Sequence, residues 1–246
     1  MKNYKDIKGD YYQQAHTEGA HKSQSFMYNT REAYFIEFMA LKNGEKILDI
    51  GCGSGTFAKE LATKYKQSKI TGADASAAVI GFARKGNNQK NLGFVTAPAE
   101  KLPFKSSSFD VVIISHLIEH LKNPEKALKE IRRVLKDGGK MFLTTPNYFS
   151  LWPLAEKVFD KTIAQKGYSL DEQHISRFNH FSIKKTVEQS GFEVEKAKTL
   201  YVFSLEASVL SQKLGHLLFG LDKAVDFLPI GMITYLSASK SSNPKS

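Results

Sequence analysis

The segment KILDIGCGSGTFAKEL, residues 46–61, constrains the fold of this chain more than any other stretch of its sequence. A short apolar run is typical of a buried strand, three glycines follow at alternate positions, and a helical pattern begins directly after them. Glycine allows the tight turn that such a loop needs, and a helix N-terminus attracts polar or anionic ligand groups. This order predicts the first unit of a ligand-binding α/β fold.

Strand-like segments alternate with helical segments as far as Pro146. The expected strands are 46–50, 69–73, 92–97, 109–115 and 140–145, and the expected helices are 54–65, 76–85 and 124–135. Such alternation indicates crossovers between parallel strands, with helices on both faces of the sheet. The predicted fold class is therefore α/β, with a Rossmann-like, doubly wound and mostly parallel sheet.

The regions on either side of this alternation follow other patterns. Residues 30–41 predict a helix with Thr30 as its N-cap. Beyond Pro146 we expect helices at 151–166 and 182–190, a strand from Phe192, an amphipathic stretch at 204–227 and a last strand at 231–239.

We expect a single domain over residues 1–246. Its expected parts are an N-terminal helical segment 1–43, a cofactor-binding core 44–147, a substrate half with a helical lid 148–238, and a disordered tail 239–246.

Composition indicates the cellular compartment and excludes some classes of binding partner. The single cysteine, Cys52, allows no intramolecular disulfide, which favours a reducing compartment, and we expect a cytoplasmic location. The first residues lack the apolar core of a secretory signal, and no run of about eighteen apolar residues predicts a membrane span. The net charge of +10 comes mainly from lysines spread along the chain, without a basic block or a nucleic-acid-binding motif. We therefore expect no DNA partner, disfavour RNA, and allow at most peripheral membrane contact.

Two cofactor classes use a glycine loop of this kind, and the neighbouring residues favour one of them. The dinucleotide pattern G-x-G-x-x-G wants its third glycine at Thr56, but here it comes one residue earlier, as Gly55. Asp49, just before the loop, would repel a pyrophosphate and attract a cationic amino group. Asp74 ends the second strand, where an acid can accept hydrogen bonds from ribose hydroxyls. These residues favour S-adenosylmethionine over NAD; an NAD-dependent oxidoreductase is the competing enzyme class.

Longer motifs follow one another in a characteristic order: ILDIGCGSG, GADAS, AEKLPF, SFDVVIISHLIEHL, LKEIRRVLKDGGKMFLTTPN and VEQSGFEV. On these motifs the chain resembles the class I S-adenosylmethionine-dependent methyltransferases, in particular the ubiquinone and menaquinone biosynthesis methyltransferases. The resemblance implies a seven-stranded sheet whose last strand is antiparallel, with S-adenosylmethionine as cofactor. It implies methyl transfer to a small-molecule acceptor, for which we favour oxygen. A non-catalytic S-adenosylmethionine-binding protein and a methyltransferase for RNA or another acceptor are the alternatives.

The resemblance also implies roles for the residues that match these motifs. Asp49 and the backbone of the loop would hold the methionine end of the cofactor, Asp74 its ribose, and the residues after the third and fourth strands its adenine and sulfonium. The implied cofactor-binding residues are Asp49, Gly51, Cys52, Gly53, Gly55, Asp74, Ala75, Ala99, Glu100, Ser115 and His116. The chain departs from the pattern at Pro98, where relatives often have an aspartate that binds the adenine amino group. Proline offers neither a side-chain acceptor nor a backbone N–H.

The string His116–Leu–Ile–Glu119–His120 matches a zinc-peptidase pattern, H-x-x-E-H. A peptidase needs both histidines on a stable helix, whereas here the string begins at the end of a predicted strand, which disfavours that function. In some relatives the histidine matching His120 acts as a general base, and in others Glu-x-x-Glu-His binds a divalent metal. His116 replaces the first glutamate here, and His174 or His180 could complete such a site. We assign His120 as the catalytic candidate and no metal ligand; local capping and packing is the structural alternative.

Further candidates lie outside these motifs. Arg31, before the first strand, could reach the cofactor carboxylate. Tyr148, Phe149 and Trp152 follow the fifth predicted strand and could line the acceptor pocket, and Arg177 falls in a polar loop of the kind that often binds substrate.

Overall fold

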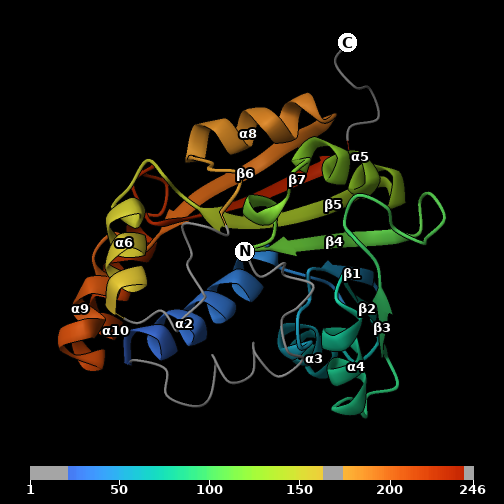
Figure 1. The fold of residues 1–246 in the computed structure, drawn as a ribbon, viewed down its shortest axis with the longest axis horizontal. Coiled ribbons are helices and arrows are strands. Elements are labelled where there is room, and N and C mark those ends of the chain that lie inside the picture. The colour runs from blue at the N-terminus through green and yellow to red at the C-terminus, as the bar shows by residue number, and fades with distance from the viewer. Residues whose placement is uncertain (1–21, 163–173, 241–246) are drawn as a thin grey trace.

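Seven strands form one sheet in the computed structural model of the protein, which describes residues 22–162 and 174–240 (Figure 1). The strands are β1 (Lys46–Ile50), β2 (Lys69–Asp74), β3 (Leu92–Thr96), β4 (Phe109–Ser115), β5 (Leu135–Pro146), β6 (Phe192–Leu200) and β7 (Ile233–Lys240). Their order across the sheet is β3-β2-β1-β4-β5-β7-β6. β7 runs antiparallel to both of its neighbours, and β1 to β5 pair in parallel. The predicted sheet with an antiparallel last strand is confirmed.

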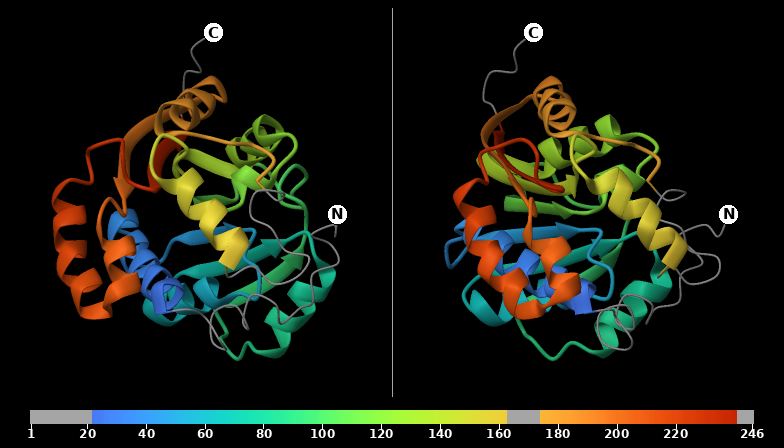
Figure 2. Two further views of the ribbon diagram at one scale, coloured as in Figure 1. Left: turned by 60° about the vertical axis from the view of Figure 1, so that its left-hand side comes forward. Right: turned by 90° about the vertical axis from the view of Figure 1, so that its left-hand side faces the viewer.

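Helices cover both faces of this sheet, with α5 and α8 on one face and α2, α3 and α4 on the other (Figure 1). The helices are α2 (Lys22–Met39), α3 (Thr56–Lys64), α4 (Ala77–Lys85), α5 (Pro124–Val134), α6 (Trp152–Thr162), α8 (His180–Gln189), α9 (Ser204–Leu210) and α10 (Gln212–Ala224), with a short 3₁₀ turn, η2 (Ile118–His120). α9 and α10 pack on each other and on α2, forming an outer layer beyond it (Figure 2). Among the described helices, none is long and apolar enough to cross a membrane.

The alternation of side chains along β1 divides the core into two layers. Ile47 packs with Phe35 of α2 and Leu61 of α3, whereas Leu48 packs with the layer that contains α5 and α8. All four side chains are fully or almost fully buried. Burying a side chain of this size contributes roughly 1.5–3 kcal/mol, so both layers hold the sheet in place.

The carboxyl ends of β1, β2 and β4 meet at one edge of the sheet, where ligands bind in open α/β folds. The glycine loop, the η2 turn and the chain entering α6 all leave the sheet there. α6, α9 and α10 lie beyond this edge (Figure 1). The topology therefore brings the predicted site residues to one side of the molecule.

Several predicted boundaries differ from the structure. α2 begins at Lys22, and the Thr30 hydroxyl donates to the carbonyl of Phe26 inside the helix, so Thr30 is not its N-cap. β5 begins at Leu135, because α5 ends at Val134 and the next residues already pair with β4. β7 continues to Lys240, so the first two residues of the predicted disordered tail, 239 and 240, belong to the strand. Some predicted segments lie partly outside the described residues. These are residues 1–21 of the N-terminal segment, residues 163–166 of the helix predicted at 151–166, and residues 241–246 of the tail.

Candidate functional site

Three positive φ angles shape the glycine loop. Gly51, Gly53 and Gly55 have φ values of 75°, 53° and 77°, a region that side chains other than glycine rarely adopt. The backbone N–H groups of Gly51 and Cys52 both donate to the carbonyl of Ala73, at 2.7 and 3.1 Å. The loop is thereby tied to the end of β2, and α3 begins directly after it.

Asp74 joins this loop to the next helix. One carboxylate oxygen accepts from the backbone N–H of Gly53 at 3.1 Å, and the other from that of Ser76 at 2.9 Å. Burial raises the pKa of Asp74, and the two backbone hydrogen bonds oppose that rise. Each oxygen has a second lone pair, so the carboxylate can still accept hydrogen bonds from a diol.

Asp49 is the buried acid of the site. It lies near the end of β1 with 3% of its surface exposed, and burial, Asp74 and Glu32 raise its pKa to about 8. A carboxyl in this state ionises readily when a cation binds beside it. Burial also raises the pKa of the Cys52 thiol, which gives that cysteine no nucleophilic character.

The predicted adenine-end residues follow the ends of β2 and β3. The backbone N–H of Ala97 donates to the carbonyl of Asp74 at 2.9 Å, which places the two strand ends side by side. Ala75 and Glu100 are half-buried, Ala99 is buried, and Pro98 is exposed.

The end of β4 is held by β5. The hydroxyls of Ser115 and Thr144 are 2.9 Å apart, and the His116 backbone N–H donates to the Thr144 carbonyl at 3.0 Å. His116 has φ of 48°, unusual for a residue other than glycine, and it turns the chain off the sheet into η2. Its Nδ1 lies 3.2 Å from Glu119 Oε1, while Nε2 is buried with no hydrogen-bond partner among the described residues.

Glu119 is completely buried and remains ionised. Its second oxygen accepts from the Thr145 hydroxyl at 3.2 Å. Burial alone would raise its pKa, but the hydrogen bond from His116 and the nearby His120 and His174 lower it to about 2. The protein therefore keeps a buried negative charge among imidazoles, an arrangement that suits a proton or a metal cation.

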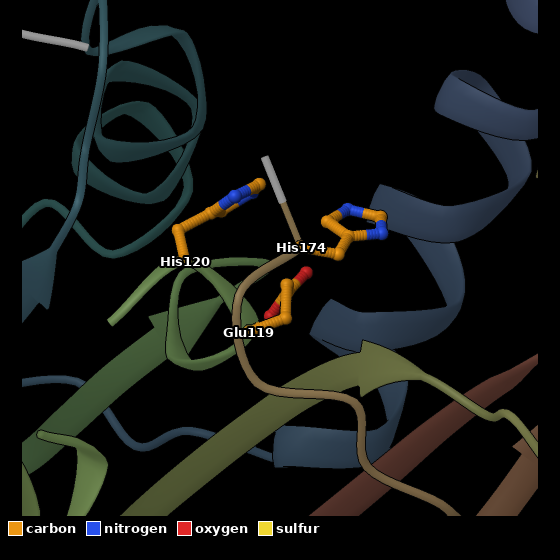
Figure 3. A group of neighbouring side chains, drawn as sticks. All are labelled: Glu119, His120 and His174. Carbon is orange, nitrogen blue, oxygen red and sulfur yellow. The ribbon is translucent and has the colours of Figure 1, made fainter. Parts of the chain in front are cut away.

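Figure 3 shows Glu119, His120 and His174 converging from η2 and from the segment that precedes α8. Each offers one ligand atom, and these atoms lie within 4.8 Å of one another. The ring centroids of His120 and His174 are 5.0 Å apart. His180, the other predicted candidate, is not in this group; its ring Nδ1 is buried without a hydrogen-bond partner in the described part of the chain.

A second layer of contacts orients His174. Its Nδ1 lies 2.5 Å from Glu156 Oε1, and the Tyr148 hydroxyl donates to both Glu156 oxygens, at 2.9 and 3.0 Å. A carboxylate accepts but cannot donate, so Nδ1 carries the proton and Nε2 the lone pair. Sequence reasoning missed Glu156; the available signal was an acid within the apolar pattern of α6.

The remaining predicted residues make separate contacts. Arg31 lies close enough to His116 to lower its pKa, although burial is the larger cause. Trp152 is buried, whereas Phe149 is 55% exposed and contacts Phe181 edge to face. The Arg177 guanidinium lies 5.8 Å from the centre of the Tyr148 ring.

A family model described as a methyltransferase domain matches residues 25–197. The malonyl-[acyl-carrier protein] O-methyltransferase of Legionella pneumophila is 36% identical over 101 residues, which are 41% of this chain and 36% of that protein. The ubiquinone biosynthesis O-methyltransferase of Coxiella burnetii is 30% identical over 115 residues, 46% of this chain and 48% of that protein. The matches thus span about half or less of these relatives.

Solved structures share the fold. The protein in complex with the Haloferax volcanii Trm112 methyltransferase activator superposes with a TM-score of 0.65 at 16% identity, over 89% of this chain and 93% of that one. At this identity the likeness concerns the arrangement of the sheet and helices alone.

Proposed function

Because this chain belongs to the class I S-adenosylmethionine-dependent methyltransferases, whose cofactor is S-adenosylmethionine, we propose that it transfers the cofactor's methyl group to a small-molecule acceptor. We propose oxygen as the methylated atom, which the names of the two O-methyltransferase relatives support. The observation that carries the proposal is the Asp74 carboxylate, bound to the Gly53 N–H at the carboxyl edge of the sheet.

The residues at this edge fit the cofactor. Asp74 has lone pairs for two ribose hydroxyls, and Ala75, Ala99 and Glu100 would flank the adenine. The loop from Gly51 to Gly55 would hold the methionine end, with Asp49 ionised by the amino cation. Such a partner explains why an acid with a pKa of about 8 is buried here.

The acceptor would lie beyond Ser115 and His116, beside His120. The bound cofactor supplies a methyl carbon that its sulfonium makes electrophilic. The protein's task is then to align the acceptor oxygen behind that carbon and to exclude water. His120 is the proposed group that receives the acceptor's hydroxyl proton.

A second role for the same cluster is favoured by the Glu156–His174 contact. Histidine ligands of metals usually donate their other ring N–H to a carboxylate, as His174 does. One carboxylate and two imidazoles suit Mn²⁺ or Zn²⁺ better than Mg²⁺. A metal on His120 would occupy the lone pair that a general base needs, so the two roles exclude one another.

The test is calorimetric titration of the chelator-treated protein with S-adenosylhomocysteine, alone and with Mg²⁺, Mn²⁺ or Zn²⁺. We expect binding without metal. Asp74→Asn should weaken it by about 10- to 100-fold, the effect of leaving ribose hydroxyls poorly paired. Asp110→Asn, a change at the opposite edge of the sheet, should leave the affinity unchanged.

Each other outcome points to a competing function. NAD binding without S-adenosylhomocysteine binding would favour an oxidoreductase. A protein that binds the cofactor but methylates no compound in a library of hydroxylated acceptors would be a non-catalytic binder. Methylation of RNA would replace the small-molecule acceptor. Metal binding that disappears in a His120→Ala variant would favour the metal role over the base.

A further inference from the structure

Helix α10 lies at the protein surface and exposes several leucines. Its inward face carries the buried Gly215 and Asp222 together with the half-buried Phe219, whose ring contacts Phe26 and Tyr201. Leu214, Leu217 and Leu221 have 38%, 71% and 55% of their surface exposed. These three positions are three and four residues apart, so they form one stripe along the helix. A surface helix ordinarily buries such a stripe against the core.

The inward face of α10 packs closely on α9 and is hydrogen-bonded to its first turn. A Cβ at Gly215 would lie 2.8 Å from the Cβ of Ser208, so α9 and α10 approach closely. The Asp222 carboxylate accepts from the backbone N–H groups of Phe203 and Ser204, at 3.0 and 3.1 Å, and from the Ser204 hydroxyl. Rotating α10 to bury its leucines would leave this buried carboxylate without partners, a costly change. The helix is therefore held with these three leucines outward.

Exposed apolar residues also precede and follow the helix. Leu210 is 84% exposed before it, and Phe227 and Ile230 are 68% and 43% exposed after it. We call these residues, with the three leucines of α10, the outer stripe. Large exposed apolar patches on soluble domains usually mark a binding surface.

The charges around the outer stripe and of the whole chain indicate what binds to this surface. Residues 210–230 contain two acids, Asp222 and Asp226, and both are buried and hydrogen-bonded. Lys213 and His216 are exposed on the same helix. The chain has a net charge of +10, so two copies repel one another while an anionic surface attracts the protein.

We infer that the outer stripe docks the protein on an anionic lipid bilayer, with α10 lying in the headgroup plane and its leucines inserted among the acyl chains. α10 lies beyond the edge of the sheet where β4 ends (Figure 1), so docking would bring that edge close to the membrane.

The test is flotation of the full chain with phosphatidylcholine vesicles and with vesicles that contain roughly one-third phosphatidylglycerol. We expect binding to the anionic vesicles that weakens at high salt. Leu217→Gln with Leu221→Gln should lower the partition coefficient at least about tenfold, while Leu217→Met with Leu221→Met should retain binding, because methionine keeps the apolar surface. Lys213→Gln should lower it about fivefold and Lys90→Gln, at the opposite edge of the sheet, should not.

Three results would overturn the inference. The first is wild-type protein that does not float with anionic vesicles. The second is a glutamine double variant, with an unchanged melting temperature, that floats as well as the wild type. The third is a wild-type dimer in light scattering that the glutamine variant converts to a monomer, which would assign the outer stripe to a second copy of the chain.

Discussion

Replacing Asp49 with asparagine should stabilise the cofactor-free protein and weaken cofactor binding. The Asp49 carboxyl is 3% exposed, and its pKa rises from 3.8 to about 8 on folding. An acid with a raised folded-state pKa destabilises the fold above its unfolded pKa, because the unfolded chain releases the proton first. Asparagine has nearly the same shape and stays neutral, so it removes this contribution to the pH dependence of stability.

The magnitude follows from the two pKa values. Stability is lost at about 1.4 kcal/mol per pH unit between the unfolded and the folded pKa. The free energy of unfolding of the wild-type protein should therefore be lower than that of Asp49→Asn by roughly 2 kcal/mol at pH 5 and roughly 4 kcal/mol at pH 7. Binding of S-adenosylhomocysteine should weaken about tenfold in the variant, because the amino cation loses a charged partner.

Urea denaturation of both proteins between pH 5 and pH 7 measures the difference. Asp110→Asn is the matched control, for which we expect the opposite change in the free energy of unfolding. Burial alone would raise the pKa of Asp110, but hydrogen bonds from the Lys136 side chain and the Lys46 backbone lower it. Its replacement should destabilise the protein. A constant difference between wild type and Asp49→Asn across this pH range would refute the reasoning, since it would mean that Asp49 is already ionised in the folded protein.

Three further predictions concern single residues. Gly55→Ala should lower the free energy of unfolding by about 2–4 kcal/mol, because φ is 77° and the new Cβ would lie 2.5 Å from the Phe94 ring; a loss in urea denaturation below about 1 kcal/mol would contradict this. Pro98→Asp should tighten S-adenosylhomocysteine binding about three- to tenfold in calorimetry but not the binding of S-inosylhomocysteine, which lacks the adenine amino group. If His174 binds a metal, Glu156→Gln should weaken Mn²⁺ binding about 10- to 100-fold in calorimetry, and an unchanged affinity would remove Glu156 from that role.

The sheet and the position of Asp74 beside the glycine loop could be predicted because their signals are local. β1 and β4 have the predicted bounds, since each is a short apolar run that both layers of the core bury. Asp74 could be selected because an acid at the end of the second strand must lie beside a loop at the end of the first.

The cluster of Glu119, His120 and His174 could not be predicted in the same way, because it depends on packing between distant segments. His174 and His180 fall in one polar stretch, and the sequence does not distinguish them. The structure does so through Asn147, whose side-chain oxygen accepts from the backbone N–H of His180 at 3.0 Å. This bond and the Ser176 N–H bond to the Glu119 carbonyl hold the segment so that His174 reaches the cluster.

The turn at His116 explains why a carboxylate lies buried at the point where β4 leaves the sheet. A positive φ ends the strand after Ser115, and a single 3₁₀ turn then brings Glu119 back against the strand end. A residue other than glycine in this conformation costs roughly 1–2 kcal/mol. The ring of His116 offsets that cost, because its Nδ1 bonds the Glu119 carboxylate and helps to keep it ionised. The strained residue and the buried charge are therefore one feature, in which His116 both turns the chain off the sheet and holds Glu119.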